Sequence, residues 1–451
     1  MNELQLLDLC NKIVSKAQGN GASASEVQVK SNRQVLADIE LGQISSVSQG
    51  QSDQLAIRVF IEGRMGCAFT NILSENEAEE ALRLALNSAR VTTTDEDWRS
   101  LSKPSVYPDV AGIWNNEAAS CEASKMVEMT VDILRVASEV EPGMIPIYGG
   151  TSAVVERNAY ANSNGVSHSE RGTAAYIMLA AIAQTESGVT PMITSFDISR
   201  GLDLNINETI NDLASTMRIC KKKVEGKKGK HTVIMHPAAY GSLLQYTLLQ
   251  SIRGDNVARG KSMIADRIGD DIASSKITLN DDGLYPDAIN TAISDDEGVP
   301  KQKTAIIDQG VLGSFLWDTY WANKMGVEST GNATRSLRQG LVEVTPNTIT
   351  IEPGDRDVHD ILSGIDYGYY IRDVQGAHSS TPESGDFSIV GNPAILVKDG
   401  ELTGAIDGLM LSGNIFDLLK QVDEVARKPI KLDSIIAPEI AFTDVNVITR
   451  G

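Results

Sequence analysis

The sequence has few residues of the kinds that bind metals or form disulfides. Its 451 residues include five histidines and four cysteines, and no C-x-x-C pair occurs. The cysteines lie far apart, as scattered thiols in a reducing compartment do. They are Cys10, Cys67, Cys121 and Cys220. This pattern argues against a disulfide scaffold and against a cysteine-rich zinc module.

Long apolar runs are also missing. No stretch approaches about 18 uninterrupted apolar residues, so no transmembrane helix is expected. The opening segment MNELQLLDLCNKIVSKA has no basic region ahead of an apolar core, and its apolar residues follow a helical period. A secretory signal is therefore not expected, and the predicted location is the cytoplasm.

Positive charge is scarce. The formal net charge is −20 at pH 7, and nucleic-acid binding needs fields of lysine and arginine, so nucleic acid is not expected as a partner. The one basic run, residues 221–230, is short and contains glycine, which favours a solvated linker. We therefore expect an N-terminal domain over residues 1–225 and a C-terminal domain over residues 226–451.

The first half combines helical and strand patterns. Its expected antiparallel strands are residues 26–30, 34–41, 54–61 and 66–70. Ser74 opens a capping box before one helix, and further helices are expected near 121–141 and 205–222. Asn164-Gly165 separates two alternating runs, 153–161 and 166–184, which predicts a hairpin because both turn residues tolerate positive φ. These patterns predict an α+β domain for the first half of the chain.

The second half of the sequence has fewer helical patterns and more strand and turn signals. One long helix is predicted over about residues 237–251, with Pro237 in its first turn. After it, turn signals such as Asp281-Asp282-Gly283 and Glu352-Pro-Gly354 alternate with strand-like segments. A mostly β domain, a barrel or a sandwich, is predicted, interrupted by a short helix near 415–422. The fold class is thus α+β, with a mostly β C-terminal domain.

The residues alone reveal no evident active site. There is no H-E-x-x-H, no G-x-S-x-G and no phosphate-binding loop. His378 lies among hydroxyl residues and is the one candidate base, but no partner carboxylate or nucleophile is visible. The acidic clusters 280–282 and 295–297 lack the spacing of a calcium loop, which favours turn and solvation roles.

An ordered series of motifs resembles the TldD/PmbA family, also known as the modulator of DNA gyrase family, over essentially the whole chain. The central motif is Gly254-Asp255-Asn-Val-Ala-Arg259-Gly260. It continues through Asp295-Asp-Glu297-Gly298 and Thr330-Gly331-Asn332, and Ser384-Gly385-Asp386 is similar to the TldE/PmbA branch. This resemblance implies Gly254, Asp255, Arg259 and His378 as candidate residues of a cleft.

The resemblance also places a degenerate metal site. In the TldD branch, a helix before the Gly-Asp element carries H-E-x-x-x-H, which binds zinc together with a late cysteine. Here those positions read Gln245, Tyr246 and Gln250, and no cysteine follows Cys220. An amide oxygen is a weak zinc ligand, and a phenol, which ionises only at about pH 10, replaces a carboxylate base poorly near neutral pH. We expect no catalytic residue, metal or cofactor in this chain.

The implied function is that of a TldE/PmbA-like subunit. Such chains pair with a TldD-type subunit that carries the zinc, and the complex degrades unfolded or short peptides, bound as an added strand at a sheet edge. No nucleic acid or membrane is expected as a partner. Two alternatives remain: a stand-alone hydrolase with a non-standard site, and a homodimeric peptide-binding protein.

Overall fold

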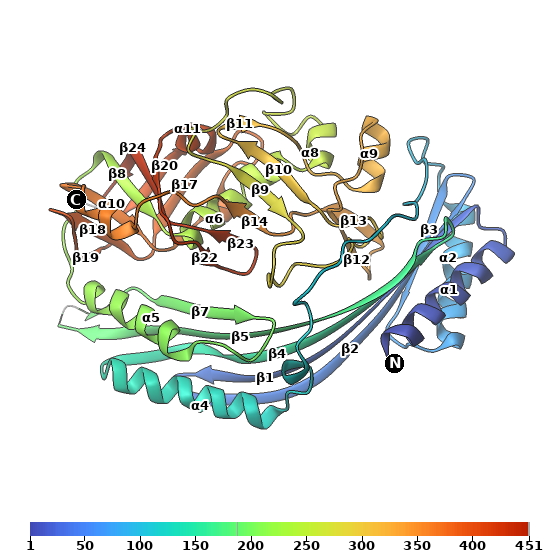
Figure 1. The fold of residues 1–451 in the computed structure, drawn as a ribbon, viewed down its shortest axis with the longest axis horizontal. Coiled ribbons are helices and arrows are strands. Elements are labelled where there is room, and N and C mark those ends of the chain that lie inside the picture. The colour runs from blue at the N-terminus through green and yellow to red at the C-terminus, as the bar shows by residue number, and fades with distance from the viewer. Residues whose placement is uncertain (187, 450–451) are drawn as a thin grey trace.

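The first half of the chain forms one long antiparallel sheet (Figure 1). Residues 1–186 and 188–449 are described in this computed structural model. The strand order is β3-β2-β1-β4-β5-β6, and β7 also pairs with β5. The strands are β1 (Ala24–Glu40), β2 (Gln43–Ile61), β3 (Arg64–Thr70), β4 (Met144–Asn162), β5 (Ser167–Thr185), β6 (Gly188–Val189) and β7 (Ile193–Ser199).

The predicted strands 26–30 and 34–41 are one continuous strand, so the separation between them was wrong. Asn32 and Arg33, which the sequence suggested as a break, stay paired with β2 on one side and with β4 on the other. Arg33 also donates from Nη2 to the carbonyl of Cys121 (2.8 Å). Polar residues therefore continue the strand, because their side chains find partners beside the sheet.

The predicted hairpin is confirmed. β4 and β5 pair antiparallel along almost their whole length, and Asn164-Gly165 forms the turn between them. Gly165 has φ 96°, a conformation that glycine adopts without steric cost.

Helices cover one face of this sheet. They are α1 (Glu3–Gly19), α2 (Glu75–Val91), α3 (Asn116–Ala119), α4 (Ala123–Val140) and α5 (Ile206–Cys220). The predicted cap of α2 is present, since the Ser74 side chain accepts from the amide of Glu77. α1 packs on β1 and β4 and α2 on β2 and β3, and their core includes Val27 and Val29 of β1. α4 packs on β1 and β4 and α5 on β5 and β7, and their core includes Val35 of β1. In Figure 1 the two helix pairs lie at opposite ends of the sheet.

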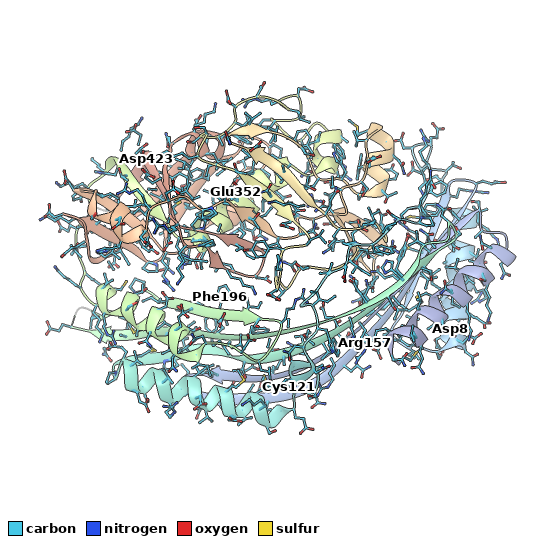
Figure 2. All side chains as sticks on the ribbon, viewed as in Figure 1. Asp8, Cys121, Arg157, Phe196, Glu352 and Asp423 are labelled. Carbon is cyan, nitrogen blue, oxygen red and sulfur yellow. The ribbon has the colours of Figure 1, made fainter. Side chains whose placement is uncertain are left out.

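The opposite face of the sheet is polar where it meets the second half. Because side chains alternate along a strand, the even-numbered residues of β1 point away from the helices. In the strand register, two adjacent rows cross β1, β4 and β5. These rows are Lys30–Asn158–Glu170 and Asn32–Glu156–Gly172. Arg157 (Figure 2) lies between Glu156 and Asn158 in the sequence, and it pairs with Glu3 of α1 (3.1 Å).

The second half builds two sheets and a hairpin. A nine-stranded sheet has the order β16-β17-β20-β24-β8-β15-β18-β19, with β21 beside β24, and a six-stranded sheet has the order β11-β10-β9-β14-β23-β22. Strands of the nine-stranded sheet are β8 (Gly229–Met235), β15 (Tyr367–Ile371), β16 (Val374–Gln375), β17 (Asp386–Gly391), β18 (Ala394–Lys398), β19 (Glu401–Ile406), β20 (Met410–Asn414), β21 (Val422–Val425) and β24 (Ile440–Ile448). Those of the other sheet are β9 (Leu279–Asp282), β10 (Lys303–Asp308), β11 (Val311–Leu312), β14 (Ile349–Ile351), β22 (Ile430–Lys431) and β23 (Ile435–Ala437), and the hairpin is β12 (Ala333–Ser336) with β13 (Leu341–Val344).

One hydrophobic core joins the two sheets. Val233 and Ile389 from the nine-stranded sheet and Leu279 and Ile306 from the six-stranded sheet belong to the same buried cluster. The helices of this half are α6 (Pro237–Gln245), α7 (Leu248–Ser251), α8 (Gly254–Ala258), α9 (Thr319–Met325), α10 (Val358–Ser363), α11 (Ile415–Lys420) and the 3-10 helix η1 (Ala377–Ser379). The predicted α+β class with a mostly β second half is confirmed. Within residues 1–186 and 188–449, no helix has the length and apolar character needed to span a membrane.

Candidate functional site

The segment that carries Gln245, Tyr246 and Gln250 is two helices, so the single helix predicted over 237–251 was wrong. His236 caps α6 by accepting the amide of Ala238 at Nδ1 (3.1 Å), and α6 ends at Gln245. Thr247 has φ −132° and ψ −92°, and α7 begins only at Leu248. The buried Thr247 hydroxyl donates to the carbonyl of Leu243 (2.7 Å). A threonine bonded back to the preceding turn competes with regular helix, which is the physical reason for the interruption.

The interruption changes how the two glutamines lie. Five positions apart on a continuous helix, their side chains would be about 140° apart. In the structure the Gln250 side-chain amide donates to the main-chain carbonyl of Gln245 (3.0 Å). The two residues are therefore direct neighbours at the break.

Tyr246 and His378 come together at the same place. Their ring centroids are 6.5 Å apart, the rings meet edge to face, and both side chains are exposed. His378 lies in η1, which begins after Gly376 in a left-handed conformation (φ 88°). The structure thus brings the candidate base next to the central degenerate position, although nothing in the sequence linked the two.

Asp255 and Arg259 form an ion-pair cluster one helix further on. The Asp255 carboxylate accepts from Arg253 Nε (3.0 Å) and Nη2 (3.2 Å) and from Arg259 Nη1 (3.0 Å). Arg259 lies over the ring of Trp321 (4.7 Å to the centroid). Arg253 Nη1 also lies 3.5 Å from Gln250 Oε1, which connects this cluster to the break between α6 and α7.

Gly254 has a steric role. A Cβ atom at this position would lie 2.0 Å from Cε3 of Trp317, and the Gly254 amide donates to the carbonyl of Leu316 (2.7 Å). Only glycine allows this close approach of the α8 backbone to the tryptophan. Gly254 and Asp255 are buried, so they hold the segment in place, whereas Arg259 is exposed.

A groove runs past α6, between β7 and the second half. It consists of two adjoining cavities of about 270 and 490 Å³ that share Phe196, Asp212, His236, Ile430 and Lys431. Phe196 lies on β7, the long-sheet strand nearest the second half (Figure 2). Burial, and then the nearby Arg372 guanidinium, lower the pKa of His236 to about 3. β16 and β22, the last strands of their respective sheets, both border the groove, and Gln375 of β16 is three residues before His378.

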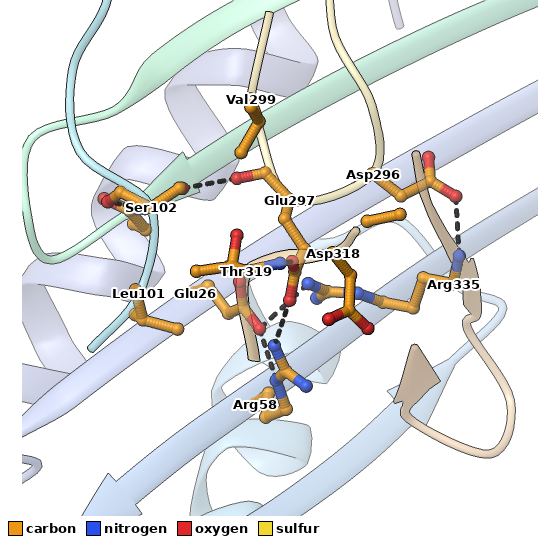
Figure 3. A network of polar contacts seen from close by, with 12 residues as sticks. Glu26, Arg58, Leu101, Ser102, Asp296, Glu297, Val299, Asp318, Thr319 and Arg335 are labelled. Carbon is orange, nitrogen blue, oxygen red and sulfur yellow. Dashed lines mark hydrogen bonds and ion pairs between the residues drawn. The ribbon is translucent and has the colours of Figure 1, made fainter. Parts of the chain in front are cut away.

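The acidic cluster 295–297 is buried, so the predicted solvation role was wrong. Asp295 and Glu297 are each 3% exposed. Lys30 of β1 donates to Asp296 (2.7 Å), and Arg58 of β2 reaches Glu297 (3.1 Å). Figure 3 shows the part of this network around Arg58 and Glu297, in which Ser102 also donates to the Glu297 carbonyl. The other cluster is buried as well, since Asp281 is 0% exposed and accepts from Asn332 and Asn347.

A second group of charged residues lies beside this cluster, at the junction between the long sheet and the second half of the chain. Glu26 is ion-paired with Arg335 (2.8 Å) and Arg58, and it accepts from the Tyr160 hydroxyl (2.5 Å). Burial would raise the pKa of Glu26, but Arg335 and Arg58 lower it to about 2. Burial and the neighbouring Glu297 raise the pKa of Asp295 to about 8. Sequence reasoning missed this junction, because its partners are far apart in the chain and no local pattern links them.

Comparison with known proteins shows which family has this architecture. The family models for PmbA/TldA metallopeptidase domain 1, the central domain and the C-terminal domain match residues 25–90, 119–223 and 228–449. The crystal structure of TldE from Thermococcus kodakarensis superposes with a TM-score of 0.93 at 31% identity, covering 97% of this chain and 99% of that one. The chain belongs to the PmbA/TldD metallopeptidase family.

Two curated relatives of this PmbA/TldD chain come from Methanocaldococcus jannaschii. An uncharacterised protein is 28% identical over 436 residues, covering 96% of this chain and 98% of the relative. A protein named as a metalloprotease is 25% identical over 404 residues, 88% of each chain. Relatives with and without a metalloprotease name therefore align with most of the chain.

The residues at the expected metal position do not fit a zinc ion. Zinc in proteins takes three or four histidine, cysteine or carboxylate ligands. Gln245 and Gln250 present amides, Tyr246 presents a phenol, and the His378 imidazole contacts Tyr246. Across residues 1–186 and 188–449, no three such side chains are grouped so that they could hold a metal ion.

Proposed function

We propose that this PmbA/TldD chain is a TldE/PmbA-like subunit that acts with a TldD-type chain on unfolded or short peptides and holds no catalytic zinc of its own. The observation that carries the proposal is the chemistry at the break between α6 and α7. The resemblance to the TldD branch aligns Gln245, Tyr246 and Gln250 with the positions of that branch's metal ligands and base. The high similarity to a protein named TldE supports the same branch.

The groove beside α6 supports a role in holding peptide. It passes two strands that end their sheets, β16 and β22, so their outer main-chain groups are placed for pairing with an extended chain. Strand addition recognises the peptide backbone and is largely independent of sequence. This chain would then guide peptide toward the zinc of the partner, in the cytoplasm.

Metal analysis and peptidase assays test the proposal. We expect the purified chain to contain no stoichiometric zinc and to leave a casein-derived peptide mixture uncut. After co-expression with a TldD-type chain, we expect one heteromeric peak in sizing and peptidase activity that a chelator abolishes. Stoichiometric zinc in the chain alone, together with chelator-sensitive activity, would overturn the proposal.

Two further outcomes address the alternatives. Metal-free activity of the chain alone that disappears in His378→Ala would establish a stand-alone hydrolase. Failure to form a heteromer, together with a stable homodimer that binds peptide, would establish a homodimeric peptide-binding protein. The His359→Ala variant, altered at an exposed histidine of α10, is the matched control for His378→Ala.

A further inference from the structure

A cavity of about 270 Å³ lies at the polar face of the long sheet, away from α6 and from the groove beside it. Its sheet wall is formed by the two rows of polar residues on β1, β4 and β5, and its other wall by residues 289–301 and part of β12. Glycine at position 172 leaves one place in the second row without a side chain. The volume is close to the lower end of the range for small-molecule sites, about 300–1,000 Å³.

Most charges around this cavity already have protein partners. Lys30 is paired with Asp296 (2.7 Å). The Arg200 guanidinium donates to the carbonyls of Thr173, Ala288, Ile289 and Thr291. Asp295 accepts three main-chain amides, those of Glu297, Val299 and Ala333. These groups build the walls of the cavity and leave little capacity for a ligand.

Three charged side chains at the cavity have unused capacity. Lys301 Nζ donates to the Asn290 carbonyl (2.8 Å), which uses one of its three N–H groups. Glu170 accepts from the Ile293 amide (3.0 Å), and Glu156 lies exposed at the mouth. Within the described residues, neither Lys301 nor these two glutamates has an oppositely charged group within ion-pair distance. Burial lowers the pKa of Lys301 and raises that of Glu170, and the attraction between the two groups only partly offsets both shifts.

The Lys301 ammonium is desolvated and has one neutral acceptor in direct contact, while the nearby carboxylates, Glu170 first among them, lie beyond ion-pair distance. A ligand carboxylate in direct contact with Lys301 would supply the close ion pair that these groups do not make. The same ligand would need a cationic group for the two glutamates on the sheet wall of the cavity. We propose that this cavity binds a small zwitterion with free amino and carboxylate groups, an amino acid or a dipeptide. The ligand carboxylate pairs with Lys301, and the ligand ammonium pairs with Glu156 and Glu170.

Such molecules are the end products of peptide hydrolysis, so the site would sense or retain product at a place separate from the groove beside α6. The proposal does not depend on the partner or on the zinc, because it concerns binding by this chain alone. Its failure and the failure of the proposed function are therefore separate results.

Calorimetry on the purified full chain tests the proposal with Ala-Ala as the probe. N-acetyl-Ala-Ala and Ala-Ala amide each lack one of the two charges, and we expect each to bind at least about tenfold more weakly than Ala-Ala. Equal binding of the blocked and unblocked peptides would overturn the proposal. So would the absence of any Ala-Ala binding at millimolar concentration.

Variants locate the site. We expect Lys301→Met to weaken Ala-Ala binding by at least about tenfold, and Glu156→Gln to weaken it without affecting folding, because Glu156 is exposed. Lys303→Met, at an exposed lysine of β10, is the matched control and should bind like the parent chain. If Lys301→Met does not fold, Glu156→Gln still decides: unchanged affinity for Ala-Ala in that variant would overturn the proposal.

Discussion

Glu26 and Arg335 form a fully buried ion pair between the long sheet and the second half of the chain. Arg335 Nη2 lies 2.8 Å from Glu26 Oε1, and the two side chains are 1% and 0% exposed. Arg58 contacts the same carboxylate, so one glutamate neutralises part of the charge of two arginines. Removing one member of such a cluster leaves an uncompensated charge in a poorly solvated site.

Glu26→Gln is therefore expected to lower the free energy of unfolding by about 3–5 kcal/mol. Urea denaturation followed by circular dichroism measures the change. Glu62→Gln is the control, because Glu62 pairs with Arg64 on the surface with its side chain 81% exposed. A loss for Glu26→Gln no larger than that of the control would contradict the prediction.

Asp318 predicts a pH dependence of stability. Burial, and then the neighbouring Glu297, raise its pKa to about 7, whereas an aspartate in the unfolded chain ionises near about pH 4. Between about pH 4 and pH 7 the folded protein therefore binds one proton more than the unfolded chain does. The contribution of Asp318 to stability is lost as the pH rises through about 7.

Asp318→Asn tests this sign. Asparagine keeps the N-cap bond of α9 to the Trp321 amide but does not titrate. From pH 5 to pH 8, we expect the variant to become progressively more stable relative to the parent chain in urea denaturation. Asp357→Asn, at the exposed N-cap of α10, should show no such trend, and a parallel pH profile for the two chains would count against the assignment to Asp318.

Gly254→Ala is expected to destabilise the protein by about 1–3 kcal/mol, because the new methyl group would overlap Trp317. The displaced indole should also shift the tryptophan emission. Gly50→Ala in β2 is the control, since a Cβ there meets no atom within 4 Å. Equal stability of the two variants would show that the close approach of Gly254 to Trp317 is not essential.

The break at Thr247 predicts an engineered metal site. In Gln245→His/Gln250→His, the interruption should hold the two imidazoles close enough to bind one zinc ion, which competition with a zinc indicator measures. Glu79→His/Leu84→His places the same spacing on the continuous helix α2, where the side chains lie about 140° apart, and should gain no comparable affinity. Equal affinity in the two double variants would refute this role of the break.

Local chemistry was readable from the sequence. Ser74 as a helix cap and Asn164-Gly165 as a turn depend on neighbours within a few residues, and the structure confirms both. Thr247 was not readable, because its interruption of the helix needs a buried hydroxyl, and burial is decided by the second half as a whole. Asp296 was given a solvation role for the same reason, since its pairing with Lys30 joins two distant elements.

The candidate site also has a part that the sequence predicted and a part that only the folded chain shows. Aligned motifs located Gln245, Tyr246, Gln250 and His378, but only the folded chain shows the contact between Tyr246 and His378. The cavity at Lys301 had no sequence signal. Its charges come from β4, β5 and the 289–301 loop. The strand register puts Glu156 and Glu170 on one face of the sheet, and only the folded chain brings Lys301 to the same cavity.

The junction around Glu26 also has a consequence for synthesis on the ribosome. β1 to β5 can pair as soon as they emerge, yet Glu26, Arg58 and Lys30 then face water until residues 296, 297 and 335 arrive. Hydrated charges on this face would keep the unfinished sheet soluble and hinder premature stacking against another nascent chain. The charged residues that form ion pairs in the finished molecule would thus first protect the incomplete chain from aggregation.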